Sequence, residues 1–338
     1  MALRSFLHLN NNMNKCIFTI VQLKFKTYVA QEYAQIRNFS KLAVKKRLSK
    51  SSITKNFRRP ESKNGFKILK PFTFTIMFSG ATFIGAVIWE YEGIRERTHR
   101  MIRSYKQWGI HRTGWRGAMQ DWWDSLSEGE KIFVPICFLN ILVFLSWHIP
   151  AFRTTMNQYF CSSPASSALC WPLLLSTFSH YSLLHLMANM YVLHNFSTYA
   201  VKTLGKEQFV LLYLVSGVLS GFTSHLYKLA MGFQNPSLGA SGAVMGIIGY
   251  SCIASPDIYL SIIFFPMLKF KASTAIKVIL GVDVMGCLLR WQRFDHAAHL
   301  GGALFGIFWQ LWGSANIWQK REPVLMFWHQ LREKSGSR

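Results

Sequence analysis

Uncharged apolar stretches recur along this chain, and they are long enough to place it in a lipid bilayer. The first, residues 71–89, contains 19 residues without a charge and is followed by Glu90. A helix rises by about 1.5 Å per residue, so about 20 residues cross a hydrocarbon core of about 30 Å. Lipid offers no partner for backbone N–H and C=O groups, whereas a helix bonds them within one segment. We therefore expect each stretch to be a membrane-spanning helix.

Six further segments complete a polytopic pattern. They cover residues 132–149 and then, approximately, 182–201, 208–231, 239–254, 274–289 and 296–312, with a second apolar stretch around 258–270 between the fifth and sixth spans. The fifth span is short and follows a breaker cluster at 232–236, so its first residues should lie below the membrane surface. The pattern predicts an all-α, polytopic membrane protein with seven spans.

The beginning of the chain is strongly basic. Residues 1–70 contain 16 Lys and Arg against only Glu32 and Glu61, which supplies +14 of the net charge of +23. A leader rich in Arg, Lys and Ser and poor in acid matches a mitochondrial targeting segment better than a secretory signal peptide, which needs a clean apolar core. A basic arm at a membrane surface is the alternative. We expect no nucleic-acid binding, because no nucleic-acid fold motif accompanies the charge.

Composition divides the chain into five parts. We expect a targeting segment at 1–67, an extra helix at 70–90, an interfacial connector at 91–130, a six-helix core at 131–315 and a basic tail at 316–338. The connector carries tryptophans beside arginines, which is typical of helices that lie at lipid headgroups. At the end of the connector, Ser127 and Glu130 have the spacing of a helix-capping box.

The cysteines are scattered and show no CxxC spacing: Cys16, Cys137, Cys161, Cys170, Cys252 and Cys287. Four of them lie in or beside apolar runs, so most should be packed thiols. Cys161 and Cys170 share the loop at 150–181 and could form a disulfide in an oxidising compartment.

Four polar side chains fall inside the predicted spans. His185 and Asn189 lie one helical turn apart in the third span, Ser241 begins the fifth, and His299 lies near the start of the seventh. A polar group in lipid is costly, so each is a functional candidate, although His185 or Asn189 taken singly would more often link helices by hydrogen bonds. Glycines near Ser241 and His299 would let their helices pack closely; they are Gly239, Gly242, Gly246, Gly302 and Gly306.

These side-chain types together suit acyl transfer. A serine becomes a nucleophile at neutral pH when a neighbouring base accepts its proton, and histidine is the usual base. Ser241 at a helix start would have backbone N–H groups nearby to stabilise an oxyanion, and Asn189 and His185 could add side-chain donors. Acyl transfer on a peptide inside a membrane is intramembrane proteolysis, so we expect a membrane serine protease.

Two acidic residues are candidates for a third catalytic group. Asp295 is placed to cap the seventh helix and is one candidate member of a triad. Asp283, inside the sixth span, is another, with packing, ion pairing or the lining of a cavity as alternative roles.

The sequence resembles a known family at these positions. Gly239-Ala240-Ser241-Gly242, Ala298-His299 with Gly302 and Gly306, and His185-x-x-x-Asn189 resemble the rhomboid intramembrane serine proteases over about residues 130–315, the six-helix core of that family. The extra span, the basic leader and the run at 294–306 resemble its mitochondrial, presenilin-associated rhomboid-like branch. Two positions depart from bacterial rhomboids: residues 150–181 lack their Trp-Arg pair, and Met245 stands where they often have Tyr.

The resemblance implies a one-plus-six arrangement of helices in the mitochondrial inner membrane, with the leader in the matrix and the tail in the intermembrane space. It implies that Ser241 is the nucleophile and His299 the base of a Ser–His dyad, and that His185 and Asn189 help to form the oxyanion hole. Substrates would be single-span membrane proteins in surrounding lipid, cut near the membrane edge in mitochondrial quality control, dynamics or apoptosis. No cofactor is implied.

Two other classes of function are left open. A catalytically weak or inactive relative would bind membrane-protein clients in the same groove. A haem or metal carrier would use five histidines, His180, His185, His194, His296 and His299. The chain has no HExxH motif and no paired cysteines, so we expect no metal site.

Overall fold

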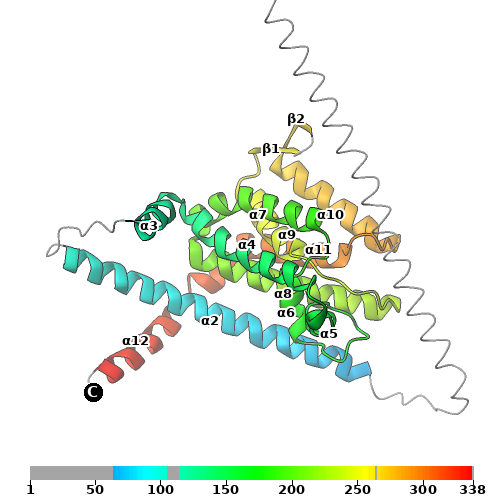
Figure 1. Ribbon diagram of the computed structural model, residues 1–338, viewed down its shortest axis with the longest axis horizontal. Coiled ribbons are helices and arrows are strands. Elements are labelled where there is room, and N and C mark those ends of the chain that lie inside the picture. The colour runs from blue at the N-terminus through cyan, green and yellow to red at the C-terminus, as the bar shows by residue number, and fades with distance from the viewer. Residues whose placement is uncertain (1–63, 105–113, 263–264, 337–338) are drawn as a thin grey trace, which may run out of the picture. The chain divides into compact units, whose positions relative to one another are not determined.

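The computed structural model describes residues 64–104, 114–262 and 265–336 (Figure 1). The chain divides into two units, Met1–Ser62 and Lys63–Arg338, and all of the described residues belong to the second. The predicted targeting segment at 1–67 therefore lies almost entirely outside the described residues.

Helices form nearly all of the regular structure in the described residues. The principal helices are α2 (Asn64–Ser104), α4 (Glu128–Ser146), α7 (Leu183–Leu204), α8 (Lys206–Met231), α9 (Ser241–Ala254), α10 (Ala272–Leu288) and α11 (His296–Phe308), which continues as the π-helix η4 (Trp309–Trp318). The shorter ones are α3 (Trp115–Ser125), η2 (Pro150–Phe152), α5 (Arg153–Tyr159), α6 (Trp171–Leu175), η3 (Ser176–Phe178) and α12 (Glu322–Gly336). One helix, α2, thus precedes a core of six, and the predicted all-α, one-plus-six class is confirmed.

The first helix, α2, is longer than the predicted span at 70–90. It contains 41 residues and extends into the predicted connector. Beyond the apolar part, Glu92 pairs with Arg95 and Glu96 with Arg100 on successive turns. Opposite charges three or four residues apart support a solvated helix, so α2 continues past the end of the apolar run.

Three described helices combine the length and the apolar character of a membrane span: the segment Lys67–Met101 of α2, α4 and α8. The other predicted spans are shorter or more polar. Helices α9, α10 and α11 contain 14, 17 and 13 residues. Helix α7 has 22 residues but includes two histidines and two asparagines. These shorter helices carry the side chains that the sequence marks as functional.

A β-hairpin occupies the apolar stretch at 258–270. Strands β1 (Tyr259–Ile262) and β2 (Phe265–Lys271) are antiparallel, with Tyr259 opposite Lys271 and Leu260 opposite Phe270. Aromatic and β-branched residues favour strands, and Pro266 lacks the N–H that a helix interior requires. The stretch therefore connects α9 to α10 without adding a helix.

Helix α9 lies at the centre of the packing, against α7, α8 and α11 (Figure 1). It has no charged residue, and ten of its 14 residues are buried. An uncharged helix can face either lipid or protein, and the glycines and alanines of α9 let neighbouring helices approach it closely. Around this centre, α4 packs on α7 and α2 packs on α8. The small residues of α9 thus suit its innermost position.

The long loop at 150–181 is packed into the protein by its second half. It contains η2, α5, α6 and η3, and the side chains of Ser179 and His180 at its end are fully buried. The indole N–H of Trp147 donates to the Ser179 hydroxyl at 2.8 Å. At the start of α4, Ser127 and Glu130 form the predicted capping box. Both features fix the ends of α4 against the core.

Candidate active site

Ser241 and His299 are in direct contact. Ser241 is the first residue of α9, and His299 lies in the first turn of α11. The Nε2 atom of His299 is 3.0 Å from the Oγ atom of Ser241, which is a hydrogen-bonding distance. The backbone turns into α9 at Gly239, whose φ of +136° suits glycine and few other residues. The structure therefore brings a hydroxyl and an imidazole together at the ends of two helices.

Close backbone contact between α9 and α11 holds this pair. A methyl group added at Gly302 would overlap the carbonyl oxygen of Gly242, and one at Gly306 would overlap that of Gly246. On its other side α9 meets α8, where a methyl group at Gly242 would overlap the Ser220 side chain. Glycine at these positions lets the backbones approach more closely than any side chain would permit. The distance between Ser241 and His299 depends on that approach.

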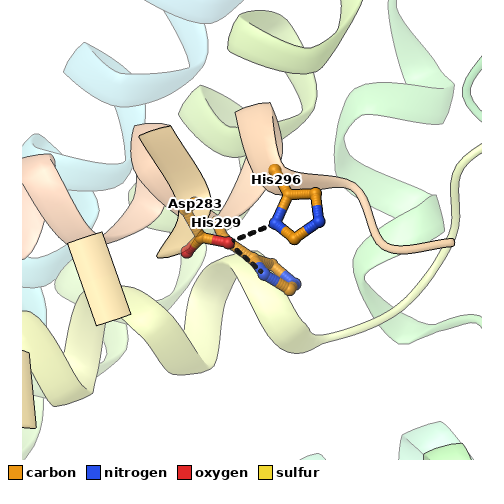
Figure 2. Close-up of side chains that lie close together, drawn as sticks. All are labelled: Asp283, His296 and His299. Carbon is orange, nitrogen blue, oxygen red and sulfur yellow. Dashed lines mark hydrogen bonds and ion pairs between the residues drawn. The ribbon is translucent and has the colours of Figure 1, made fainter. Parts of the chain in front are cut away.

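Asp283 of α10 lies behind His299, on the side away from Ser241. Figure 2 shows its carboxylate beside the two histidine rings of α11, with one oxygen facing both of them. Its Oδ1 atom is 3.4 Å from Nδ1 of His299 and 2.7 Å from Nδ1 of His296. Of the roles considered for Asp283, the structure thus shows pairing with histidine by polar contacts. Ser241, His299 and Asp283 form a continuous chain of polar contacts.

Asp295, the other acidic candidate, contacts a different set of residues. Its carboxylate accepts from the backbone N–H of Ala298 at 3.1 Å, so the predicted helix cap is present. It also bonds Ser224 and Ser237 and lies 3.2 Å from Nζ of Lys228. Burial by itself would raise the pKa of Asp295, but the Lys228 ammonium and the hydroxyls hold that pKa below its ordinary value. The suggestion that Asp295 completes a triad is therefore wrong, because its charge is committed to Lys228.

The predicted oxyanion side contains His185, Asn189 and also His180, which the sequence suggested only as a haem or metal ligand. Nε2 of the buried His180 accepts from the backbone N–H of Ala240 at 3.3 Å, and its ring meets that of His185 at 4.9 Å. Burial lowers the pKa of His180 to about 3, which keeps the ring neutral and able to accept. Asn189 donates one amide N–H to the carbonyl of His185, on its own helix, at 2.9 Å. No pattern in the sequence indicated that His180 contacts the backbone at Ala240, because burial of a loop residue has no local signal.

Comparison with known proteins identifies the family. A rhomboid domain matches residues 168–316. The mitochondrial presenilin-associated rhomboid-like protein of Rattus norvegicus is 46% identical over 276 residues, which cover 78% of this chain and 72% of the relative. The Homo sapiens protein of the same name is 45% identical over 271 residues, with the same coverage. This chain belongs to the mitochondrial rhomboids of the presenilin-associated branch. It is a multi-pass protein of the mitochondrial inner membrane, as predicted.

A more distant relative of this rhomboid comes from yeast. The mitochondrial Rhomboid protein 1 of Saccharomyces cerevisiae is 32% identical over 194 residues, which cover 55% of this chain and 54% of the relative. Membership of the family makes the chain a rhomboid-type intramembrane protease in class, with membrane proteins as its type of substrate.

The disulfide considered for this rhomboid is not formed. Cys161 and Cys170 are both free thiols. The Cys161 sulfur contacts the Tyr181 hydroxyl at 3.5 Å, whereas the Cys170 thiol points to the carbonyl of Lys70. Burial raises the pKa of Cys161 to about 11. A thiol that stays protonated at neutral pH is a packing group and not a nucleophile.

Proposed function

We propose that this rhomboid is an active serine protease that cleaves single-span membrane proteins in or near their transmembrane helices, with Ser241 as nucleophile and His299 as general base. The observation that carries the proposal is the contact of 3.0 Å between Oγ of Ser241 and Nε2 of His299. Few structural roles require a serine and a histidine to meet at the ends of two buried helices, whereas acyl transfer requires it.

The reaction follows from the positions of these atoms. Nε2 of His299 takes the hydroxyl proton while Oγ of Ser241 bonds to the scissile carbonyl carbon. The tetrahedral intermediate places a negative charge on the carbonyl oxygen, which the N-terminal end of α9 stabilises together with side-chain donors from His185 and Asn189. The intermediate then expels the amine, which receives the proton from His299. Water, activated by His299, releases the acyl group and restores the serine.

Asp283 acts in this scheme as a positioning residue. Its carboxylate accepts the Nδ1 proton of His299, so that the Nε2 lone pair faces Ser241. A carboxylate in that place also stabilises the positive charge that the imidazole gains when it accepts the serine proton. Rhomboids were expected to work with a dyad, and this chain supplies a third polar group.

The depth of the site favours substrates that lie in the membrane. Helix α9, with 14 residues, is about 21 Å long, shorter than the hydrocarbon core of about 30 Å. Ser241 at its first residue would then lie below the membrane surface, where the helix of a single-span protein can reach it. We place the leader in the matrix and the tail in the intermembrane space, and we assign the activity to mitochondrial quality control, dynamics or apoptosis.

The test uses full-length protein in liposomes with a single-span substrate. Ser241→Ala should abolish cleavage, and His299→Ala should lower its rate by about 10²- to 10⁴-fold, the usual contribution of a general base. Ser251→Ala is the matched control, because Ser251 is a buried serine on the same helix whose hydroxyl has no hydrogen-bond partner within the described structure.

Cleavage that persists in Ser241→Ala would refute the assignment. A wild-type protein that binds the substrate without cutting it would instead support the client-binding alternative. The formed contact between Ser241 and His299 argues against that alternative, since binding alone does not require it.

A further inference from the structure

Three side chains of metal-ligand type meet beside the proposed catalytic pair. They are Asp283 of α10 and the two histidines of α11, His296 and His299, and one ligand atom from each lies within 4.8 Å of the others (Figure 2). Both imidazoles turn Nδ1 toward the same carboxylate oxygen. The cluster combines two residues of the proposed mechanism, Asp283 and His299, with a histidine, His296, for which that mechanism has no use.

The carboxylate in this cluster has unused binding capacity. Asp283 is 3% exposed, and its Oδ2 atom is buried without a hydrogen-bond partner among the described residues. In the described part of the chain, its ion-pair partners are the two histidines, without a lysine or arginine. Asp295, one residue before α11, differs because it has Lys228. A buried carboxylate that lacks a fixed positive charge favours a bound cation.

The packing around His296 holds it in place for ligation. Its ring lies against Gly286 of α10, where an added methyl group would overlap it. The rings of Trp291 and Phe294 flank it, with centroids at 5.7 Å and 6.1 Å. A ligand fixed by its surroundings loses little conformational freedom on binding a metal, which raises affinity. His296 thus belongs to a preformed site.

We propose that Asp283, His296 and His299 bind Zn²⁺, and that bound zinc inhibits the protease. Two imidazoles and one carboxylate are a recurrent zinc ligand set, with a fourth position left for water. Tetrahedral bonds of about 2.0–2.1 Å to nitrogen place ligand atoms about 3.3 Å apart. The observed spacings of 2.7 Å and 3.4 Å from Oδ1 of Asp283 to the two Nδ1 atoms bracket that value.

Inhibition follows from the two tautomers of His299, and this half of the proposal rests on the proposed function. For hydrolysis, His299 holds its proton on Nδ1 and offers the Nε2 lone pair to Ser241. Zinc takes the Nδ1 lone pair, so the one proton of the neutral ring moves to Nε2 and points at the serine oxygen. Nε2 then has no lone pair for the serine proton. Zinc binding and general-base catalysis therefore exclude one another.

The binding experiment does not need proteolytic activity. Zinc is titrated by calorimetry into full-length Ser241→Ala protein in detergent micelles, and we expect about one zinc per chain. Adding His296→Asn, which keeps a donor toward Asp283 but lacks the ligand, should weaken binding at least tenfold, and so should adding Asp283→Asn. The control is His194→Asn, because His194 also pairs with a carboxylate, Glu130 at 3.7 Å, but lies on α7. Unaltered zinc affinity in both cluster variants would overturn the site.

The inhibition experiment measures cleavage of a single-span substrate in liposomes with added zinc and with a chelator. Each variant is compared with its own rate in chelator. Zinc at about ten times its dissociation constant should reduce wild-type cleavage to about a tenth, with recovery on chelation, and should have little effect on His296→Asn. Zinc bound at full occupancy without loss of activity would overturn the inhibition. A chain inactive even in chelator would refute the proposed function, while the calorimetry would still decide the metal site.

Discussion

Asp283 places a buried negative charge in a helix that otherwise packs among apolar side chains. Such a charge is costly in a membrane protein unless a partner compensates it, and here the compensation comes from imidazole. A single carboxylate therefore does two things in the proposed scheme: it orients the base, and among the described residues it is the acidic group that both histidines contact. Substituting Asp283 therefore tests its contribution to catalysis.

Asp283→Asn should lower kcat by about 10²-fold while KM changes little, because the amide cannot stabilise the imidazolium that forms when the serine is deprotonated. Steady-state cleavage in liposomes measures both constants. Asp257→Asn is the matched control, since Asp257 pairs with Lys271 at 2.9 Å on the exposed hairpin. A kcat equal to that of the wild type would restrict Asp283 to a structural or metal-binding role.

The residues of the site differ in how far sequence could predict them. Ser241 and His299 stood out because each polar group lies beside spaced glycines in an apolar segment. Asp283 was one of two acidic candidates, and the sequence could not choose it over Asp295, because it is 16 residues from His299 and reaches it only through the angle at which α10 meets α11. Asp295 was the nearer acid in sequence, and its pairing with Lys228 of α8 depends on a contact between distant helices.

The elements α9 and α11 show how small residues set the geometry of a reacting pair. Their backbones touch at Gly242 and Gly302, so the spacing of the helices is fixed by main-chain atoms. The pattern of glycines predicted this approach. The hairpin at 259–271 was not predicted as a strand, because an apolar run of that length is compatible with either a helix or a strand. Only Pro266 disfavours the helix.

Gly302→Ala should destabilise the protein by more than the roughly 1–3 kcal/mol usual for overpacking, since the added methyl group meets backbone that cannot rotate away. Thermal unfolding in detergent micelles measures the loss, and cleavage should fall with it as Ser241 and His299 separate. The control is Gly281→Ala on α10, where an added methyl group meets no atom within 4 Å. That variant should be neutral or gain about 0.5–1 kcal/mol from helix propensity. Equal stability of the two variants would contradict the packing argument.

At the scale of the molecule, the extra helix α2 is bound to the C-terminal end of the chain. Arg321, between η4 and α12, makes a two-pronged contact with Glu90 of α2 at 2.6 Å and 2.9 Å. Arg332 of α12 does the same with Glu92 at 2.8 Å and 2.9 Å. The segment predicted as a basic tail thus carries two arginines, Arg321 before α12 and Arg332 within it, that pair with acidic residues of the first helix. Neither its charge nor its composition revealed that pairing.

Glu90→Gln should loosen α12, because it leaves the partly buried guanidinium of Arg321 without its carboxylate. A lost charged hydrogen bond usually costs roughly 1–3 kcal/mol, so hydrogen exchange of the amides at 322–336 should become about 5- to 150-fold faster. Glu96→Gln is the control, as Glu96 pairs with Arg100 on the exposed surface of the same helix. Exchange rates in α12 that match the control would show that other contacts hold this helix.

The main-chain contact between α9 and α11 also bears on how the sequence of such a protein can drift over time. Where two helices meet through carbonyl oxygens and α-carbons, no compensating change in a facing side chain can make room for a larger residue. Substitutions at the lipid-facing positions are free to accumulate, while those few glycines can be replaced only at the expense of the alignment between hydroxyl and imidazole. The smallest residues in the chain thus preserve the relative position of Ser241 and His299.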